Sequence, residues 1–459
     1  MTQFFDAIVI GAGQAGPSLA GRLTAAGMKV ALVERKLFGG TCVNTGCMPT
    51  KTLIASAYAA HLARRGVDYG ITIESPIKID MRRIKARADT VSTNARTGVE
   101  TWLRDMAGLT VIEGHARFEG PDVVRVGDSL LKAPRTFINV GGRASVPALP
   151  GIDSVEYLTN TSILKLDTVP RHLVVGGGSY IGLEFAQMYR RFGAEVTIIE
   201  KGPRLIARED EDVSEAVREI LVDEGIVVRT DATCIALKPH ADGVAVGIDC
   251  ISGEPAAVGS HILLAVGRRP NTDDLGLDKA GVAVDARGYI EVDDALATNV
   301  PGIWALGDCN GRGAFTHTSY NDYEIVAANL LDGGNHRVSD RIAAYALYVD
   351  PPLGRVGLSE TEAMRLGHKL LVSKRPMTRV GRAIEKGETK GFMKVVADAE
   401  TKQILGAAIL GVSGDEAIHG ILDMMNAGAS YPVLQWAVPI HPTVSELIPT
   451  VLGDLKPTT

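Results

Sequence analysis

Two cysteines, Cys42 and Cys47, lie five residues apart in the segment F-G-G-T-C-V-N-T-G-C-M-P-T-K at residues 38–51. A disulfide across so short a loop is geometrically constrained, and constrained disulfides are easily reduced. Good helix formers occupy residues 51–62, so Cys47 is expected near a helix start, where the helix dipole and free N–H groups favour the thiolate. Lys51, one turn further on, adds a positive charge nearby. The spacing therefore favours a redox role for the pair.

A structural disulfide and half of a zinc site are the alternative interpretations of this segment. Zinc needs two further ligands at short spacing, and the sequence has no second Cys or His pair of that pattern, so no resident metal is expected. Five cysteines is an odd and low number, which fits a reducing compartment with one working pair and predicts a cytoplasmic protein. The five are Cys42, Cys47, Cys234, Cys250 and Cys309.

A glycine pattern typical of dinucleotide binding follows the first apolar run, residues 7–10. It reads G-A-G-Q-A-G at residues 11–16, and a helical stretch and a second apolar run ending in Glu34 come after it. Strand, G-x-G-x-x-G, helix, strand and acid form the dinucleotide fingerprint, in which the acid binds the ribose hydroxyls. Gly11 allows the tight turn, Gly13 allows the backbone to approach a pyrophosphate closely, and Gly16 allows the helix to pack on the strand.

A second pattern of this kind follows the apolar run at residues 172–175. In this pattern, residues 177–182, Ser179 stands where the second glycine is usual. Serine is small enough for the backbone to approach a nucleotide closely. The helix and strand after it end in Glu200, which favours the 2′-hydroxyl of NADH over the 2′-phosphate of NADPH. Lys201 and Arg204 lie close by and could bind that phosphate, so NADPH stays open. The expected nucleotide contacts are Gly177, Ser179, Gly182 and Glu200.

Four further residues could carry chemistry. Glu184 is expected on the helix of the second pattern, where it either answers the helix dipole or pairs with a cation, because buried acids are seldom unpaired. Asp308 ends an expected strand at the carboxyl edge of a sheet, where such sheets bind ligands. His441 begins the segment H-P-T-V-S-E, in which Glu446 could hold one ring nitrogen and leave the other free as a base. A lone histidine near a chain end is more often inert.

The bulk composition is that of an ordinary globular protein. Of the 459 residues, 46% are hydrophobic and 22% charged. The net charge is −6 and no basic run occurs, which argues against a nucleic-acid partner. No apolar stretch reaches the about 18 residues of a membrane helix, and the N-terminus lacks the features of a signal peptide, so no membrane partner is expected.

The order of patterns predicts an α/β fold with two Rossmann-like modules followed by an α+β domain. We expect a long surface helix at residues 79–107, a β-meander at 110–139 and a helix at 322–331. The α+β part should contain strands at 344–348, 392–397 and 405–410 and helices at 360–366 and 415–427. The predicted domains are residues 1–147 with 273–340, residues 148–272, and residues 341–459.

The segment G-G-T-C-x-N-x-G-C-x-P-x-K resembles the redox-active segment of the flavoprotein disulfide reductases, the class I pyridine nucleotide-disulfide oxidoreductases. This family includes dihydrolipoamide dehydrogenase, glutathione reductase and mercuric reductase, and the resemblance covers nearly the whole chain. It implies that the first module binds FAD, that the second binds NADH or NADPH, and that the C-terminal domain forms a homodimer. It also implies a redox-active Cys42–Cys47 disulfide, with Cys47 next to the flavin and Cys42 as the thiol that attacks the substrate.

The resemblance assigns roles to the other candidate residues. Lys51 would pair with Glu184 beside the flavin, Asp308 would bind the ribityl chain, and the helix at 322–331 would point its N-terminus at the flavin. The dyad of His441 and Glu446 would act on the cysteines of the other subunit. Further cofactor contacts are expected at Gly40, Thr41, Gly141 and Gly267.

The substrate is less well determined than the family. Mercuric reductases carry a C-terminal cysteine pair and a tyrosine in place of the dyad histidine, and this chain has neither. The segment F-T-x-x-S-x-x-D-Y at residues 315–323, together with residues 345–352, is more similar to the bacterial reactive-chlorine-resistance flavoproteins, which are linked to copper ion reduction and oxidative defence. We therefore expect a stress-related NAD(P)H reductase of a small disulfide or a thiol-reactive metal ion. A dihydrolipoamide dehydrogenase is the alternative enzyme, and a flavin-binding scaffold or assembly subunit is the alternative of another class.

Overall fold

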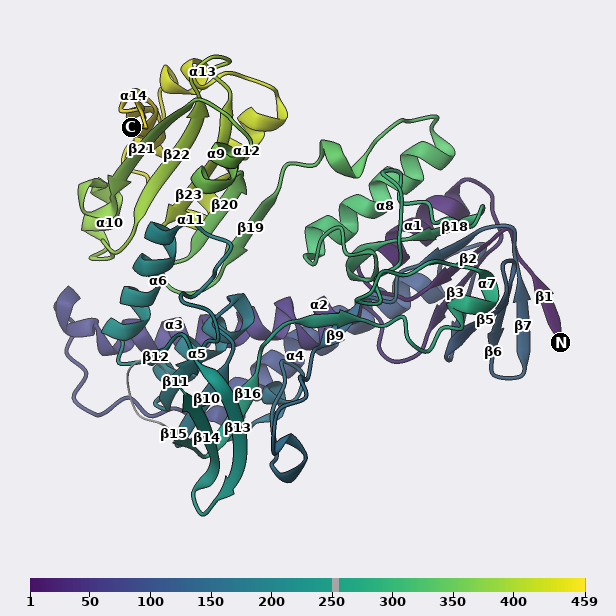
Figure 1. The fold of residues 1–459 in the computed structure, drawn as a ribbon, viewed down its shortest axis with the longest axis horizontal. Coiled ribbons are helices and arrows are strands. Elements are labelled where there is room, and N and C mark those ends of the chain that lie inside the picture. The colour runs from purple at the N-terminus through teal and green to yellow at the C-terminus, as the bar shows by residue number, and fades with distance from the viewer. Residues whose placement is uncertain (250–255, 459) are drawn as a thin grey trace.

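The computed structural model describes residues 1–249 and 256–458, so Cys250 lies outside the described residues (Figure 1). The N-terminal module is built on a parallel sheet of five strands in the order β18-β8-β2-β3-β4. These strands are β2 (Ala7–Ile10), β3 (Val30–Glu34), β4 (Leu109–Glu113), β8 (Thr136–Ile138) and β18 (Ile303–Ala305). Every residue of β2 and β8 is buried, as expected for parallel strands that are covered on both faces.

Alternate residues of these strands enter two different layers. Val9 and Leu32 pack against α1 (Ala15–Ala25) and α8 (Thr316–Leu331) on one face. Ile8 and its neighbours pack on the other face against a second sheet of order β1-β7-β6-β5. That sheet consists of β1 (Thr2–Phe4), β5 (Ala116–Gly120), β6 (Val123–Val126) and β7 (Ser129–Lys132), and α7 (Leu277–Ala280) lies against it.

Two expectations for this module need correction. Only the middle of residues 110–139 forms the antiparallel meander, because β4 and β8 join the parallel sheet, where fully apolar strands can be buried on both faces. The helix expected at 322–331 starts six residues earlier, at Thr316. The Thr318 hydroxyl accepts a hydrogen bond from the Phe315 amide at 3.2 Å and so closes the first turn.

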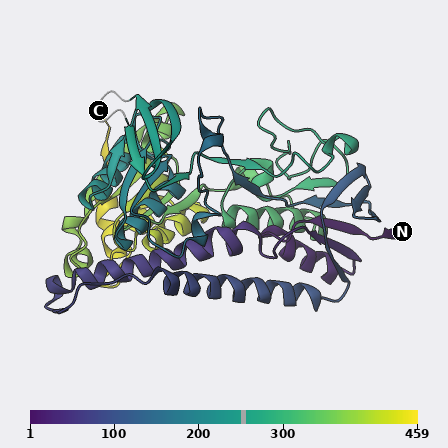
Figure 2. The same cartoon turned by 90° about the horizontal axis from the view of Figure 1, so that it is seen from below.

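A pair of long helices runs beside both modules. The short helix α2 (Gly40–Thr45) is followed directly by α3 (Cys47–Arg64), and α4 (Met81–Arg104) returns alongside α3 (Figure 2). The helix α4 is slightly shorter than expected because the Asp80 side chain caps its N-terminus by accepting from the Arg83 amide. Cys47 is thus the first residue of a helix, as predicted.

The second module repeats the parallel architecture. Its sheet has the order β12-β11-β10-β16, with α5 (Tyr180–Phe192) and α6 (Glu211–Asp223) packed on it. The strands are β10 (His172–Gly176), β11 (Glu195–Ile199), β12 (Val227–Arg229) and β16 (His261–Leu264). An antiparallel sheet of β13 (Thr233–His240), β14 (Gly243–Asp249) and β15 (Ala256–Gly259) completes it. The chain enters and leaves this module through the paired short strands β9 (Gly142–Ala144) and β17 (Arg268–Pro270).

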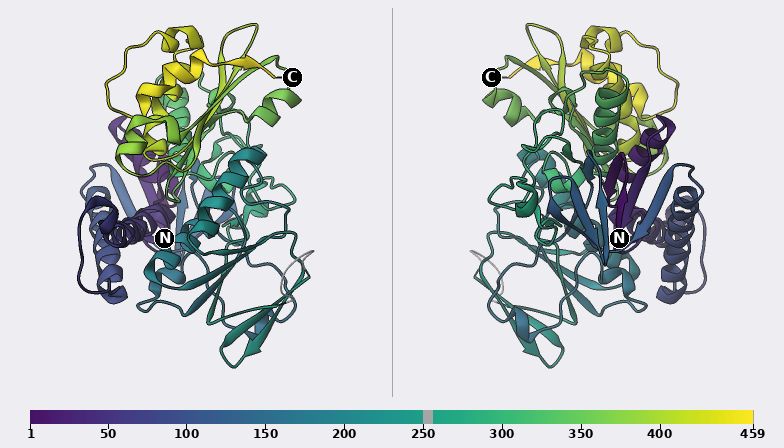
Figure 3. Two further views of the ribbon diagram at one scale, coloured as in Figure 1. Left: turned by 90° about the vertical axis from the view of Figure 1, so that its left-hand side faces the viewer. Right: turned by 90° about the vertical axis from the view of Figure 1, so that its right-hand side faces the viewer.

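The C-terminal domain lies at the top in both views of Figure 3 and packs against α3 and α5. It is an antiparallel six-stranded sheet of order β19-β20-β23-β22-β21-β24. Its strands are β19 (Ala344–Leu347), β20 (Leu353–Gly357), β21 (Leu370–Pro376), β22 (Phe392–Asp398), β23 (Ile404–Leu410) and β24 (Lys456–Pro457). Its helices are α9 (Glu360–Arg365), α10 (Gly381–Glu385), α11 (Gly414–Ala417), α12 (His419–Asn426), α13 (Tyr431–Gln435) and α14 (Ile448–Gly453).

One face of this sheet packs on its own helices and the other on α3 and α5. Leu353 and Leu410 share a core with Leu53 of α3 and Leu183 of α5, which fixes the domain against the redox segment. The helix expected at 415–427 is divided into α11 and α12. Within the described residues, no helix has the length and apolar character needed to cross a membrane.

Candidate active site

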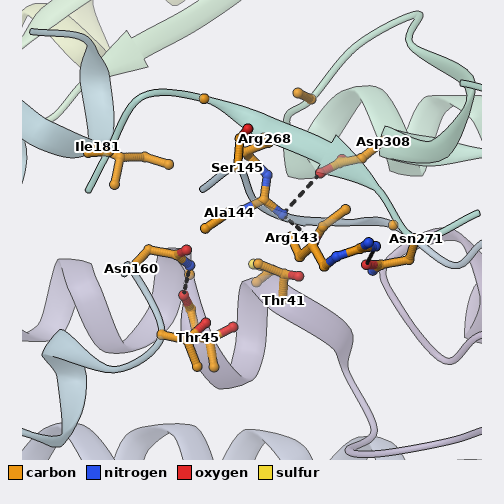
Figure 4. Close-up of a pocket in the computed structure, with 18 of the residues that line it drawn as sticks. Thr41, Thr45, Arg143, Ala144, Ser145, Asn160, Ile181, Arg268, Asn271 and Asp308 are labelled. Carbon is orange, nitrogen blue, oxygen red and sulfur yellow. Dashed lines mark hydrogen bonds and ion pairs between the residues drawn. The ribbon is translucent and has the colours of Figure 1, made fainter. Parts of the chain in front are cut away.

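A cavity of about 2280 Å³ lies where the two modules meet the C-terminal domain, and Figure 4 shows part of its lining. Small-molecule sites are typically about 300–1,000 Å³, so this one has room for more than one ligand group. All three parts of the chain contribute to its wall. Among the lining residues are Gly13, Cys42, Cys47, Lys51, Glu184, Asp308 and Tyr345.

Cys42 and Cys47 are both free thiols on the wall of this cavity. A hydrogen bond from the Cys42 thiol, aided by the Thr316 hydroxyl and the charge of Lys51 and opposed by burial, lowers the pKa of Cys47 to about 6. The same hydrogen bond, together with burial, raises the pKa of Cys42 well above its usual range. The reduced pair therefore holds one proton, on Cys42, and one thiolate, on Cys47.

The structure brings Lys51 and Glu184 together, as the resemblance implied. Nζ of Lys51 lies 2.7 Å from Oε2 of Glu184, whose side chain is only 6% exposed. The other carboxylate oxygen of Glu184 accepts a hydrogen bond from the Tyr348 amide at 3.1 Å. The Tyr348 ring lies under the ammonium group, with Nζ 4.6 Å from its centroid, a cation–π contact. The cation is therefore fixed from α5 and from the C-terminal domain, one helical turn from Cys47.

The first glycine pattern forms a narrow cradle after β2. Gly11 has φ +109°, and a Cβ there would collide with the carbonyl oxygen of Asn139. A Cβ on Gly40 would lie 2.7 Å from the Cα of Gly13, so the redox segment and the first turn approach each other closely. Glu34 accepts hydrogen bonds from the backbone amides of Ala12 and Lys36, both at 2.8 Å. Gly16 has no room for a side chain because the Gly11 carbonyl lies against it.

The second pattern has the same construction. Gly177 has φ +109°, and a Cβ there would lie 2.5 Å from the carbonyl oxygen of Ala265. Ser179 has φ −113°, an ordinary extended conformation, which explains why serine is accommodated there. A Cβ on Gly182 would meet the carbonyl of Gly177. The carboxylate of Glu200 is held by the amides of Gly178 and Gly202, at 2.6 and 2.7 Å.

Asp308 lies just beyond β18 in the middle of the cavity wall (Figure 4). Burial raises the pKa of its carboxyl group, and the nearby Arg268 guanidinium opposes that shift. Nη2 of Arg268 is 3.5 Å from Oδ2 of Asp308 and donates to the Gly142 carbonyl at 2.6 Å. Gly141 and Gly267, at the two crossings between modules, both have positive φ and also line the cavity.

His441 and Glu446 form a dyad away from this cavity. Nδ1 of His441 is 2.9 Å from Oε2 of Glu446, and the Thr443 hydroxyl accepts from the Glu446 amide at 3.2 Å. The histidine side chain is 81% exposed and does not line the cavity of its own chain. Large apolar side chains next to it are also exposed, namely Trp436, Val438 and Ile440.

Comparison with known proteins assigns the family. Residues 5–322 match the pyridine nucleotide-disulphide oxidoreductase family, and residues 343–452 match its dimerisation domain. The chain belongs to the pyridine nucleotide-disulphide oxidoreductases. The predicted fold class and enzyme class are thereby confirmed: two Rossmann-like domains, a C-terminal dimerisation domain, and an oxidoreductase that uses FAD and a pyridine nucleotide.

Several members of the family are similar over almost the whole chain. The probable pyridine nucleotide-disulfide oxidoreductase RclA of Escherichia coli is 35% identical, over 98% of this chain and 99% of that protein. The dihydrolipoyl dehydrogenase of Thermus scotoductus is 34% identical (96% and 95%) and the mercuric reductase of Bacillus cereus 32% (96% and 70%). The solved structure of a Cu(II) complex of the HOCl-induced flavoprotein disulfide reductase RclA from Escherichia coli matches with a TM-score of 0.89, at 34% identity over 98% and 99% of the two chains.

Four residues of this oxidoreductase that line the cavity escaped prediction. Arg268 stands in the segment G-R-R-P-N, which has the composition of a loop. Asn160 is buried and donates to the Thr45 carbonyl at 3.0 Å, linking the second module to the end of α2, between the two cysteines (Figure 4). Thr316 and Tyr348 reach the site from α8 and the C-terminal domain. The segments that contain them, residues 315–323 and 345–352, indicated a branch of the family but assigned neither residue to the site.

Cys309 has no part in this site. It is fully buried, its thiol donates to the Leu306 carbonyl at 3.2 Å, and burial raises its pKa to about 12. It is therefore an inert core residue. Within the described ranges, no group of His, Cys, Asp and Glu side chains could hold a metal ion.

Proposed function

We propose that this oxidoreductase passes electrons from NAD(P)H through FAD and a redox-active Cys42–Cys47 pair to a small disulfide or a thiol-reactive metal ion, in oxidative or metal stress. The observation that carries the proposal is the position of Cys47. Its thiol has a lowered pKa, contacts Cys42, and shares one cavity with Lys51, Glu184 and both glycine turns. An inert structural thiol would need none of these features.

The residues around the first glycine turn fit FAD. The cradle of Gly11, Gly13 and Gly40 leaves space that a Cβ would fill, and the carboxylate oxygens of Glu34 would accept hydrogen bonds from the ribose hydroxyls. Asp308 would bind the ribityl chain, and Thr41, Gly141 and Gly267 line the same space. FAD, when bound, would take a hydride from the nicotinamide and supply an electron pair to the sulfurs. We assign residues 1–147 and 273–340 to this domain, 148–272 to the nicotinamide domain and 341–459 to the interface domain.

The two reduced cysteines differ in protonation and would therefore have different roles. Cys47 keeps the negative charge beside Lys51, whereas Cys42 holds the proton and must lose it before it can attack a substrate. A base is therefore needed, and the partner subunit's His441, oriented by its Glu446, would supply it in a homodimer. Positioned acid–base groups of this kind typically contribute about 10²–10⁴ in rate.

NADH is the preferred nucleotide in this proposal. Glu200 places a carboxylate where a 2′-phosphate would lie, and like charges repel there. Nη2 of Arg204 donates to the carbonyls of Ala207 and Glu209, at 3.2 and 3.3 Å, which leaves it less available for a phosphate.

The stress-related branch is favoured over dihydrolipoamide dehydrogenase. Similarity to RclA, whose solved structure is described as HOCl-induced and as a Cu(II) complex, extends across both chains. A dihydrolipoamide dehydrogenase remains the second candidate because a relative of that name is nearly as similar. A scaffold function is disfavoured because both cysteines are present and face the cavity. A dithiol centre that must be kept reduced fits a cytoplasmic location.

The test is a side-by-side assay of the FAD-loaded protein with lipoamide, oxidised glutathione, Cu(II) and Hg(II), each with NADH and NADPH. The proposal expects NADH-linked reduction of a disulfide or metal ion that Cys42→Ala abolishes and Cys309→Ala leaves intact. Fast NADH-linked reduction of lipoamide above all other activities would replace the first candidate with the second. Reduction that survives Cys42→Ala would contradict both.

A further inference from the structure

The hydroxyl group of Thr316 contacts the sulfur of Cys47. Oγ1 of Thr316 is 3.3 Å from Sγ of Cys47, within hydrogen-bonding distance for sulfur, although the two residues are 269 positions apart in the chain. Either atom could donate when Cys47 is a thiol. A thiolate has no proton, so in that state the threonine hydroxyl must be the donor.

Two helices begin at this contact. Cys47 is the first residue of α3, an 18-residue helix, and Thr316 is the first residue of α8, a 16-residue helix. The amides of a first helical turn lack partners within the helix and carry the positive end of its dipole. The contact between Cys47 and Thr316 therefore joins the first residues of two helices.

Stacked aromatic rings fix the position of Thr316. The ring of Phe315 stacks on His317, with 5.4 Å between centroids, and on Tyr345, with 5.5 Å. Nε2 of His317 is 2.7 Å from the carbonyl oxygen of Ala344, at the start of β19. The backbone on both sides of Thr316 is thus held by the C-terminal domain, which leaves its side chain directed at Cys47.

The charged and titratable groups that face Cys47 come from its own helix and from three other parts of the chain. Lys51 of α3 favours the thiolate, but its ammonium is already paired with Glu184 of α5, which disfavours it. Tyr348, after β19, has a raised pKa, chiefly through burial, and is neutral. Cys42 of α2 donates its thiol proton. Lys51 and Glu184 thus act on the thiolate in opposite directions, and the hydrogen-bond donors Cys42 and Thr316 both stabilise it.

We propose that Thr316 is a positioning residue whose hydroxyl donates a hydrogen bond to the Cys47 thiolate and so sets the protonation state of the reduced pair. The inference rests on the proposed redox role of the cysteines. When the pair is reduced by two electrons from the nicotinamide, the S–S bond breaks, the Cys42 sulfur takes up one proton, and the Cys47 sulfur keeps its electron pair as a thiolate. Without the Thr316 hydroxyl, the pair would take up a second proton at a higher pH.

The experiment compares three full-length, FAD-loaded proteins in a Cys42→Ser background: Thr316, Thr316→Ser and Thr316→Val. Valine has nearly the shape of threonine but cannot donate, whereas serine keeps the hydroxyl. The readout is the pH midpoint of the long-wavelength thiolate-to-flavin absorbance band, which is independent of turnover. Melting temperatures of the three proteins verify that they fold equally.

The inference predicts that Thr316→Val moves the midpoint upward by about one pH unit, because a hydrogen bond to the charged form is lost. Thr316→Ser should stay close to the parent. Superimposable titrations of the valine variant and the parent would overturn the inference while leaving the dithiol centre intact. A parent without the band, or with a midpoint near the ordinary thiol value of 9.0, would overturn the proposed function and this inference with it.

Discussion

Lys51 and Glu184, which are 133 residues apart in the chain, join two domains, with Nζ of Lys51 2.7 Å from Oε2 of Glu184. Lys51 belongs to the helix that Cys47 begins, and Glu184 belongs to the helix that follows the second glycine turn. The pair therefore couples the redox segment to the nucleotide-binding turn. The carboxylate of Glu184 is buried and the ammonium of Lys51 is about one-third exposed, so this ion pair is intermediate between a surface pair and a buried pair.

The first prediction concerns this pair. Glu184→Gln keeps the shape of the side chain but removes its charge, and we expect the free energy of unfolding to fall by about 1.5–3 kcal/mol, the range for hydrogen bonds to charged groups. Urea titration measures it. The control is Asp332→Asn, which breaks an exposed pair with Arg22 and should cost no more than about 1 kcal/mol. If the two substitutions lowered the free energy of unfolding equally, the Lys51–Glu184 pair would contribute no more to stability than the exposed pair.

The second prediction concerns pH. Only the thiolate reacts with alkylating agents, so the rate of Cys47 alkylation in the reduced protein should fall as the pH drops through about 6 and change little between about pH 7 and 9. Folding lowers the pKa of Cys47 from the ordinary thiol value of 9.0 to about 6. Ionisation of this thiol therefore stabilises the folded state fully above about pH 9, and the stabilisation is lost as the pH falls through about 6. Peptide mass spectrometry identifies the modified residue, with buried Cys309 as the unreactive control. A Cys47 rate that still rises steeply up to pH 9 would contradict the assignment.

The third prediction concerns nucleotide choice. Glu200→Ser removes the carboxylate from the ribose site, and we expect the kcat/KM ratio of NADPH to NADH to rise roughly tenfold, equivalent to about 1.4 kcal/mol. Steady-state kinetics with both nucleotides measure it. The control is Glu195→Gln, which changes an exposed acid at the start of β11, the strand that Glu200 follows, and should leave the ratio unchanged. An unaltered ratio in Glu200→Ser would mean that other residues select the nucleotide.

The sequence allowed much of the fold and site to be predicted because the chemistry is concentrated in local patterns. Cys42, Cys47 and Lys51 are close in the chain, and each glycine turn is a contiguous segment with its own strand and helix. Those parts need no knowledge of tertiary contacts.

The residues that escaped prediction share the opposite property. Thr316 meets Cys47 across 269 positions and Asn160 meets Thr45 across 115, so no spacing rule connects them. The strands β4 and β8 were misplaced for a related reason, since a short apolar run does not reveal which sheet it joins. Such relationships are decided by packing between domains.

The fourth prediction concerns the dyad. His441 is exposed in its own chain, so the proposal requires that it act on the cysteines of a partner. Hybrid dimers of Cys42→Ser and His441→Ala chains would contain one intact site, and random mixing should restore roughly a quarter of wild-type activity from two inactive parents. Turnover assays of co-refolded chains measure this. No recovery in verified hybrids would place the base elsewhere.

The central claim is that electrons reach a reversible sulfur–sulfur bond between Cys42 and Cys47. Its most direct test is an anaerobic titration of the FAD-loaded protein with NADH, followed by absorbance, beside the Cys42→Ala variant. The claim predicts that the wild-type protein takes up two electron pairs, one for the sulfurs and one for the flavin, with a long-wavelength band from the Cys47 thiolate while the flavin is still oxidised, and that the variant takes up only one pair. Uptake that ends with the flavin in both proteins would contradict it.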